Sequence, residues 1–182
     1  MKQWLSALTY GVAFGFILLA SGAAMTVAAE LNPGDQAPDF SLQGSDGKTY
    51  KLSDLKGKTV VIAWFPKAFT GGCTKECKAF KEDGAEMRKF DVVYFTASVD
   101  DAQKNKEFAE KLEVDYPILS DPSKETAKAF GVIPEGKETA ARWTFYIGPD
   151  GKIKFVDKKI NVDSSAKDVA AKLQELGVAK KS

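Results

Sequence analysis

The chain has 182 residues, of which 28% are charged and 44% hydrophobic, a composition typical of one globular domain with a single core. It contains no histidine and only two cysteines, which excludes Ser-His and Cys-His dyads, histidine-containing metal sites and four-cysteine zinc or iron–sulfur sites within one chain. Lys2 is the only charged residue before Glu30, so residues 30–182 are neutral overall and give no electrostatic reason to expect nucleic acid or an anionic membrane as a partner.

Residues 1–29 have the layout of a secretory signal peptide, with Lys2 first, then an apolar stretch, then small residues ending at Ala29. We expect cleavage after Ala29, with Ala23 or Ala24 as alternative sites, which leaves residues 30–182 as an exported domain in the periplasm or cell envelope. The apolar stretch is also long enough to span a bilayer if it is not cut, so an N-terminal membrane anchor stays the alternative.

The first half of the exported domain begins with a linker, residues 30–39, followed by two short extended pieces around an Asp-Gly turn. This pattern predicts a small β-hairpin over residues 40–51. Residues 59–65 are continuously apolar and rich in β-branched side chains, which predicts a strand buried on both faces. Pro66 ends this strand, and the apolar spacing of residues 73–90 predicts a helix.

The second half alternates strands and helices in the same way. Its predicted elements are a buried strand over 92–99, a helix from Asp100-Asp101 to Leu112, an extended piece over 116–119, a helix from Asp121 to Phe130, strands over 143–147 and 153–156, and a last helix over 165–176. This order predicts an α/β fold in which helices flank both faces of a central mixed β-sheet.

The segment between the buried strand and the following helix lies where open α/β sheets form their ligand sites. Gly71 and Gly72 free the backbone there, and Cys73 falls in the first turn of the predicted helix. Unpaired N–H groups and the positive end of the helix dipole stabilise an anion at this position, so the sequence predicts a reactive thiolate at Cys73.

Two other side chains are candidates for the same site. The hydroxyl of Thr70, three residues before Cys73, can turn back toward the thiolate or an incoming oxygen, although Thr70 also suits a helix N-cap. An arginine would add fixed positive charge, and Arg88 and Arg142 are the candidates after residue 30. Arg142 precedes the apolar run at residues 143–147, where a central strand would hold its guanidinium toward the site.

These residues resemble the peroxiredoxins, most closely the bacterioferritin-comigratory or Q-type branch with the nearby alkyl hydroperoxide reductases. Pro66, Thr70 and Cys73 match the family pattern Pro-x-x-x-Thr-x-x-Cys, and Arg142 matches the family arginine ahead of a late strand. Glu76 matches a glutamate that many members carry three residues after the reactive cysteine, although an acidic residue near a helix start also suits an exposed surface. The resemblance extends from about Gly34 to the C-terminus.

The resemblance implies a thioredoxin-like fold and a thiol peroxidase. In such an enzyme the Cys73 thiolate attacks a hydroperoxide and becomes a sulfenic acid. Thr70 and Arg142 bind the peroxide oxygens, Pro66 shields the oxidised sulfur, and Glu76 is a supporting residue. The resemblance implies that no metal or organic cofactor is needed. It implies a hydroperoxide as the substrate and a thioredoxin-like or other thiol as the reductant. The protein is expected to be a monomer or a homodimer.

Cys77 lies four residues after Cys73 on the same helical face, which makes it a candidate resolving cysteine. Such neighbours have Cβ atoms about 5–6 Å apart in an intact helix, whereas a disulfide prefers roughly 3.5–4.5 Å. A Cys73–Cys77 disulfide therefore requires residues near 72–78 to unwind. The Q-type pattern places its resolving cysteine five residues on, so the alternative is that Cys77 only fills the core.

Three other functions stay open at this point. An exported copper chaperone of thioredoxin-like fold would use the Cys-x-x-x-Cys pair, but that class adds a distant histidine ligand that this chain lacks. A thiol–disulfide oxidoreductase normally has Cys-x-x-Cys, one residue shorter than the spacing here. The third is an interaction module of thioredoxin-like fold with structural cysteines. Such a module would not account for the presence of both Thr70 and Arg142.

Overall fold

The structure is a computed structural model that describes residues 30–181. The predicted signal peptide or membrane anchor, residues 1–29, lies outside the described residues and stays a prediction. Within the described part of the chain, no helix is both long and apolar enough to cross a membrane.

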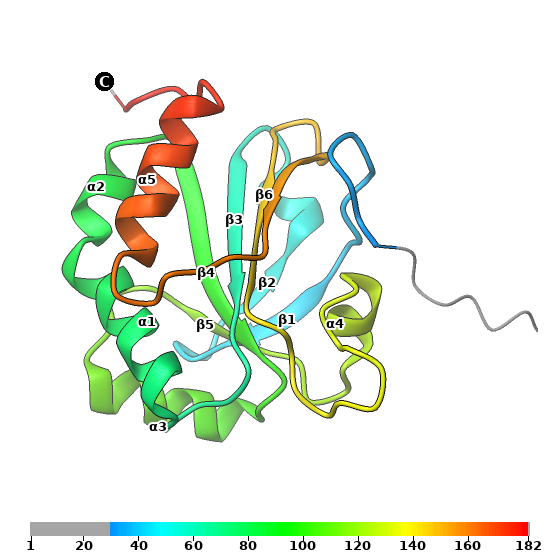
Figure 1. The fold of residues 1–182 in the computed structure, drawn as a ribbon, viewed down its shortest axis with the longest axis vertical. Coiled ribbons are helices and arrows are strands. Elements are labelled where there is room, and N and C mark those ends of the chain that lie inside the picture. The colour runs from blue at the N-terminus through cyan, green and yellow to red at the C-terminus, as the bar shows by residue number, and fades with distance from the viewer. Residues whose placement is uncertain (1–29, 182) are drawn as a thin grey trace, which may run out of the picture.

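A seven-stranded mixed sheet forms the centre of the molecule (Figure 1). The strands lie side by side in the order β2-β1-β5-β4-β3-β6-β7, with β3, β4 and β5 parallel and the other pairs antiparallel. Their bounds are β1 Ser41–Gly44, β2 Thr49–Lys51, β3 Thr59–Trp64, β4 Val92–Ser98, β5 Ile118–Ser120, β6 Trp143–Ile147 and β7 Ile153–Asp157. The predicted N-terminal hairpin is β1–β2, and every residue of β3 is buried, as its uniform apolar pattern predicts.

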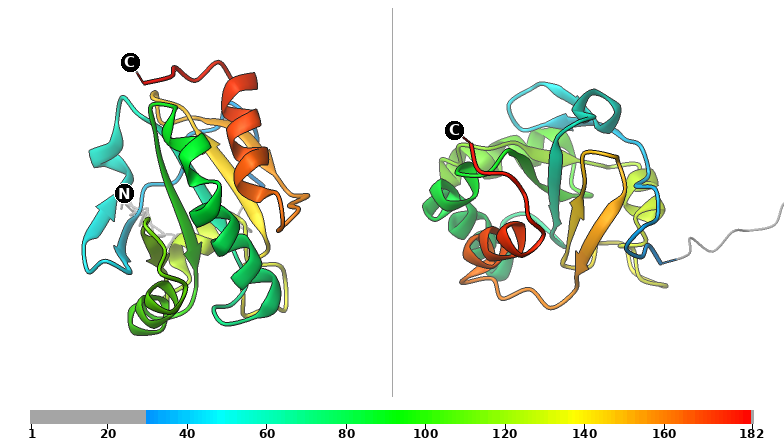
Figure 2. Two further views of the ribbon diagram at one scale, coloured as in Figure 1. Left: turned by 90° about the vertical axis from the view of Figure 1, so that its left-hand side faces the viewer. Right: turned by 90° about the horizontal axis from the view of Figure 1, so that it is seen from above.

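Helices cover both faces of the sheet, as Figures 1 and 2 show. One face carries four helices, which are α1 Gly71–Glu82, α2 Gly84–Arg88, α3 Ala102–Leu112 and α5 Ser165–Glu175. The other face carries α4 Glu125–Ala129 and a 3₁₀ helix, η1 Leu52–Leu55. Each layer encloses its own apolar cluster against the sheet, so the predicted mixed sheet with helices on both faces is confirmed.

The helix predicted over residues 73–90 is two helices, α1 and α2, separated at Asp83. Asp83 has ψ near 4°, which ends the regular helix, and Gly84 follows with the low helix propensity of glycine. A Cβ atom at Gly84 would lie 3.0 Å from Arg88 Nη1 and 3.2 Å from the Tyr94 hydroxyl oxygen, so glycine leaves room for the hydrogen bond between these two side chains.

The helix predicted from Asp121 to Phe130 is shorter than expected and begins at Glu125. Lys124 precedes it in the left-handed region, with φ of 62°, so residues 121–124 form a turn rather than a first helical turn. The Asp121 carboxylate still serves this helix, because its Oδ2 accepts a hydrogen bond from the Ala127 amide over 2.7 Å.

Candidate active site

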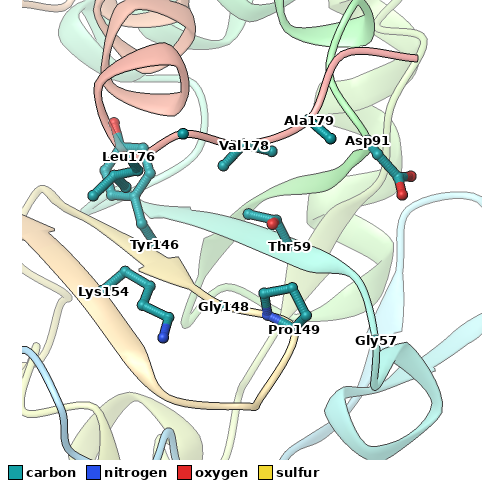
Figure 3. Close-up of a pocket in the computed structure, with 11 residues that line it drawn as sticks. Gly57, Thr59, Asp91, Tyr146, Gly148, Pro149, Lys154, Leu176, Val178 and Ala179 are labelled. Atoms are coloured by element: carbon teal, nitrogen blue, oxygen red, sulfur yellow. The ribbon is translucent and has the colours of Figure 1, made fainter. Parts of the chain in front are cut away.

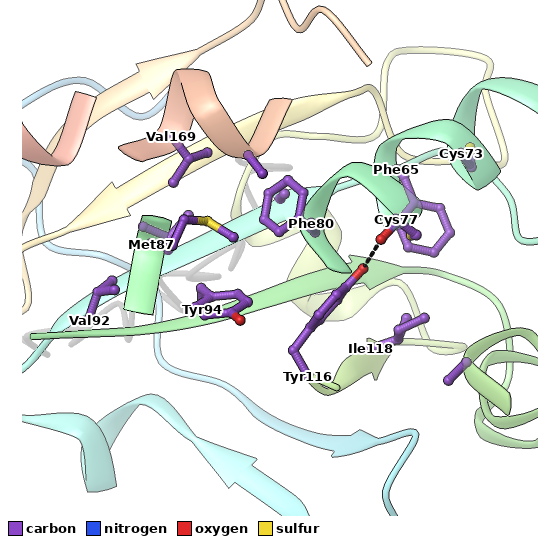
Figure 4. Close-up of a cluster of buried hydrophobic side chains, with 14 of the residues drawn as sticks. Phe65, Cys73, Cys77, Phe80, Met87, Val92, Tyr94, Tyr116, Ile118 and Val169 are labelled. Atoms are coloured by element: carbon purple, nitrogen blue, oxygen red, sulfur yellow. Dashed lines mark hydrogen bonds between the residues drawn. The ribbon is translucent and has the colours of Figure 1, made fainter. Parts of the chain in front are cut away.

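Cys73 is the third residue of α1, the helix that follows the carboxyl end of β3 after a short loop. It is 1% exposed and lies on the apolar stripe of α1 that faces the sheet (Figure 4). Its sulfur therefore lies at the N-terminal end of a 12-residue helix, where unpaired amide groups and the positive end of the helix dipole attract negative charge. The predicted position of Cys73 is confirmed.

Arg142 reaches this sulfur from the other end of the sequence. It immediately precedes β6, which pairs with β3 in a register that sets Trp143 opposite Trp64. That register brings Arg142 to the end of β3 where α1 begins, and its Nη2 donates to Cys73 Sγ over 3.2 Å. Arg88, the other candidate, instead donates to Tyr94 and Asp115.

Glu76 is completely buried and is the ion-pair partner of Arg142, through the Arg142 Nη1 and Glu76 Oε2 atoms. Its other oxygen, Oε1, has no hydrogen-bond partner among residues 30–181. Burial raises the pKa of the Glu76 carboxyl to about 7, although the charge of Arg142 opposes this shift. The interpretation of Glu76 as an exposed helix residue is therefore wrong, and its position supports the arginine.

Gly72 provides the space that the guanidinium occupies. A Cβ atom at this position would lie 3.3 Å from Arg142 Nη2, which is tighter than ordinary van der Waals contact. A Cβ atom at Gly71 would have no neighbour within 4 Å. Only the second of the two glycines is therefore constrained by the approach of Arg142.

Thr70 precedes α1 and is exposed, but its hydroxyl does not bond to an amide of that helix. It donates to the backbone carbonyl of Lys67 over 2.9 Å instead. The Thr70 hydroxyl is thus bonded within its own loop in this structure, and its predicted turn toward the thiolate or an incoming oxygen stays a prediction. Pro66 is half-buried at the start of the same loop, directly after the buried residue Phe65.

Cys77 lies one helical turn beyond Cys73 and is completely buried among the side chains under α1. Both cysteines are free thiols. Burial, followed by the nearby charge of Glu76, raises the pKa of the Cys77 thiol to about 12. The Tyr116 hydroxyl donates to the Cys77 backbone carbonyl over 2.9 Å, a bond drawn as a dashed line in Figure 4.

Two residues that the sequence analysis did not single out contact this region. Tyr116 holds the backbone of α1 at Cys77, and Asp100 accepts a hydrogen bond from the Ala68 amide in the loop before α1 over 2.8 Å. The position of Asp100 could have been inferred from the sequence. It follows β4, the parallel neighbour of β3, so it lies at the edge of the sheet where the loop before α1 also lies.

A separate cavity of about 300 Å³ lies at the opposite end of β3 (Figure 3). Thr59, the first residue of β3, and Pro149 form one side of it, and Val178 and Ala179 of the C-terminal segment form the other. The site at Cys73 follows the last residue of β3, so the cavity and the thiol lie at different ends of the sheet.

Comparison with known proteins finds peroxiredoxin relatives. The model of the AhpC/TSA family matches residues 33–156. A putative peroxiredoxin Bcp of Coxiella burnetii is 33% identical over 146 residues, which cover 77% of this chain and 97% of the relative. Peroxiredoxin Bcp of Bacillus subtilis is 33% identical over 149 residues, which cover 79% of this chain and 95% of the relative.

Solved structures of similar proteins share the architecture. Peroxidoxin BcpB from Mycobacterium tuberculosis superposes with a TM-score of 0.73 at 32% identity, over 80% of this chain and 98% of that chain. A PrxQ mutant from Xylella fastidiosa superposes with a TM-score of 0.76 at 25% identity, over 82% and 99% of the two chains. The predicted thioredoxin-like fold is thereby confirmed.

Proposed function

The chain belongs to the AhpC/TSA family and is a thiol peroxidase, and from this premise we propose that Cys73 is the residue that reduces the hydroperoxide. The observation that carries the proposal is the contact of Arg142 Nη2 with Cys73 Sγ at 3.2 Å, at the N-terminal end of α1. A guanidinium and a helix N-terminus together favour the thiolate, which is the nucleophilic form of cysteine.

The reaction at Cys73 balances without a cofactor. The thiolate attacks one oxygen of the hydroperoxide, so that an S–O bond forms while the O–O bond breaks. The second oxygen leaves with the bonding electron pair and takes a proton, which gives water from hydrogen peroxide or an alcohol from an organic hydroperoxide. Arg142 and the unpaired amides at the start of α1 stabilise the negative charge that develops on the leaving oxygen.

Thr70 would bind the substrate through its oxygen rather than its proton. Because its hydroxyl proton is donated to the Lys67 carbonyl, the lone pairs of its oxygen are left to accept the hydrogen of a peroxide hydroxyl. Pro66, half-buried at the start of the loop, would limit access of water and of further peroxide to the sulfenic acid.

We assign the second step to Cys77. Its thiol would displace water from the Cys73 sulfenic acid and form a disulfide, which an external dithiol of a thioredoxin-like protein would reduce by thiol–disulfide exchange. Cys77 is completely buried within an intact helix, so this step requires the first turns of α1 to unwind. The departure from the regular helix would also expose the disulfide to its reductant.

Stopped-flow measurement of the reduced protein with hydrogen peroxide, followed through intrinsic tryptophan fluorescence, tests the proposal. We expect fast oxidation of the wild-type protein, its loss in Cys73→Ser, and its retention in Cys77→Ser. Mass spectrometry after one equivalent of peroxide should show one added oxygen in Cys77→Ser and a disulfide in the wild type. A Cys73→Ser protein that consumes peroxide as fast as the wild type would refute the assignment of Cys73.

A further inference from the structure

Asp100 connects the start of α3 to the loop that carries Thr70. It lies between β4 and α3, with its side chain only 9% exposed. Its Oδ2 accepts a hydrogen bond from the backbone amide of Ala68 over 2.8 Å, although the two residues are 32 positions apart in the sequence. This bond joins two loops that follow neighbouring parallel strands, β3 and β4.

The loop that Asp100 holds has an unfavourable backbone. Phe69, the residue after Ala68, has φ of 65°, a region that bulky residues rarely adopt. Such a conformation persists only where the surrounding structure holds it in place. On the backbone, the Ala68 amide bonds to Asp100 before Phe69, and the Thr70 hydroxyl bonds to Lys67 after it. The Phe69 ring packs on Phe108 with centroids 5.0 Å apart and lies 5.6 Å from the Lys111 ammonium.

Asp100 is itself held by a buried polar network, so its carboxylate is a fixed acceptor. Ser98 Oγ lies 3.1 Å from the Asp100 Oδ2 atom, and Lys104 Nζ lies 2.5 Å from its Oδ1 atom. Asn105 Nδ2 donates to Ser98 Oγ over 3.0 Å and to Ser120 Oγ over 2.9 Å. Ser98, Asn105 and Ser120 are all buried, and satisfied buried networks of this kind are rigid.

We propose that Asp100 is a positioning residue for peroxide reduction, an inference that rests on the proposed function. By accepting the Ala68 amide hydrogen, Asp100 fixes the loop of residues 66–70 and thus the place of the Thr70 oxygen relative to Cys73. It contacts no reacting atom. Its effect falls on the alignment of the peroxide, because the groups that stabilise the thiolate belong to α1 and to Arg142.

This separation gives the proposal a distinct kinetic signature. Misplacing a group that aligns a substrate lowers the rate of the chemical step, and a displacement of about 1 Å is enough to cost up to ~100-fold. Alkylation of Cys73 by iodoacetamide needs the thiolate but not the aligned loop. The ratio of the peroxide rate constant to the alkylation rate constant therefore reports the positioning role, and a purely structural role would leave that ratio unchanged.

Asp100→Ala, Asp100→Asn and Asp101→Ala form the test, with the wild-type protein alongside. Asp101, the next residue, is the matched control. Its carboxylate caps α3 by accepting a hydrogen bond from the Lys104 amide over 2.8 Å, so its loss weakens α3 but leaves the bond to Ala68 in place. For each protein, the rate constants of Cys73 with hydrogen peroxide and with iodoacetamide are measured, with urea unfolding as a check on stability. Asp100→Leu, which is close in shape to aspartate but has no acceptor atom, replaces Asp100→Ala if that variant does not fold.

We expect Asp100→Ala to lower the rate ratio at least tenfold, and Asp100→Asn, which keeps an acceptor oxygen, to stay within about threefold of the wild type. Asp101→Ala should keep the wild-type ratio. An unchanged ratio in Asp100→Ala, or the same loss in Asp101→Ala, would overturn the positioning role while leaving the proposed function intact. A wild-type protein that alkylates but does not react with peroxide would overturn the proposed function, and this inference with it.

Discussion

Arg142 donates through Nη2 to the sulfur of Cys73 over 3.2 Å, although the two residues are 69 positions apart in the sequence. The antiparallel pairing of β6 with β3 creates this contact, because it sets Trp143 opposite Trp64 and leaves the next residue outward beside the loop before α1. The same guanidinium binds the Glu76 carboxylate through Nη1. Arg142 is thus held by the carboxylate on one side and faces the thiol with the other.

Replacing Arg142 by alanine should slow the reaction of Cys73 with hydrogen peroxide by about 10²–10³-fold, the usual cost of removing one preorganised donor from a developing negative charge. The lost guanidinium also contacts the sulfur itself, so alkylation of Cys73 by iodoacetamide should slow as well. Stopped-flow kinetics measures the first effect, and Arg88→Ala, whose guanidinium contacts Tyr94 and Asp115, is the control. Equal losses in the two variants would mean that Arg142 has no special role.

Gly72→Ala and Gly71→Ala should differ although both add one methyl group to the first turn of α1. A Cβ atom at Gly72 would lie 3.3 Å from Arg142 Nη2, so the guanidinium must shift away from Cys73, and we expect the peroxide rate to fall about 3–30-fold, by analogy with small displacements of aligned groups. A Cβ atom at Gly71 meets open space, so that variant should keep the wild-type rate. Equal rates in the two variants would show that Arg142 adjusts without cost.

The sequence patterns that predicted most successfully were those that depend on local chemistry or on burial alone. The continuous apolar run of β3 and the placement of Cys73 at a helix start needed no knowledge of distant contacts. The buried position of Glu76 was also within reach, because it lies three residues after Cys73 and four before Phe80, which places it on the same helical face. The general preference for exposed acidic residues near helix starts led to the wrong interpretation of Glu76 as an exposed residue.

The features that sequence patterns missed depend on contacts between distant segments. The Asp100 carboxylate accepts a hydrogen bond from the Ala68 backbone amide. Because nearly every residue has a backbone amide, the sequence around Ala68 does not indicate that this one is bonded. The same holds for Tyr116 and the Cys77 carbonyl, which are 39 positions apart. The predicted start of α4 was wrong for a local reason, because Lys124 adopts a left-handed conformation and the Asp121 carboxylate accepts from the Ala127 amide rather than capping a helix that begins next to it.

Cys77→Ser should separate the first oxidation step from recycling. We expect the rate constant of Cys73 with hydrogen peroxide to stay within about twofold of the wild type, because the Cys77 thiol contacts the Thr96 hydroxyl, whereas Arg142 contacts Cys73 and Glu76. Turnover with a thioredoxin-like reductant should fall strongly, since the Cys73 sulfenic acid then has no internal thiol partner. Mass spectrometry of the wild-type protein that shows a stable sulfenic acid with free Cys77 would reject the resolving role.

Tyr116→Phe should accelerate the formation of the Cys73–Cys77 disulfide. The Tyr116 hydroxyl bonds to the Cys77 carbonyl in the folded helix, and burial raises the pKa of this tyrosine well above its usual value, so it stays a donor. Removing a hydrogen bond worth about 1 kcal/mol favours the unwound helix about fivefold. Quenched-flow mass spectrometry after a pulse of peroxide measures the rate of disulfide formation.

Tyr94→Phe is the control for this effect. Tyr94 packs beside Tyr116 with ring centroids 5.6 Å apart, but its hydroxyl is bonded to Arg88 on α2 instead of the backbone of α1. We expect this variant to form the disulfide at the wild-type rate. An acceleration of equal size in both variants would indicate a general loosening of the cluster rather than release of the Cys77 carbonyl.

Glu76 should make the free energy of unfolding of the reduced protein decrease as the pH rises from about 4.5 through 7. Burial raises its pKa in the folded protein to about 7, from 4.5 for the unperturbed group. Between these two values the folded protein holds a proton that the unfolded chain has lost, so protonation stabilises the fold. This contribution to stability is complete below about pH 4.5 and disappears as the pH rises through 7. Because each pKa unit of difference between the folded and unfolded states corresponds to about 1.36 kcal/mol, the contribution amounts to roughly 3 kcal/mol.

Glu76→Gln tests this dependence because glutamine has the same shape and does not titrate. Urea unfolding of the reduced wild type and variant at pH values from 4.5 to 8 gives the difference in the free energy of unfolding between them at each pH, in which the contributions of all other groups largely cancel. We expect this difference to shift in favour of the variant as the pH rises, since only the wild type must then bury an ionised carboxylate beside Arg142. A difference that stays constant across this range would mean that Glu76 does not titrate there. A shift in favour of the wild type would mean that the ion pair with Arg142 outweighs burial and holds the pKa of Glu76 below its usual value.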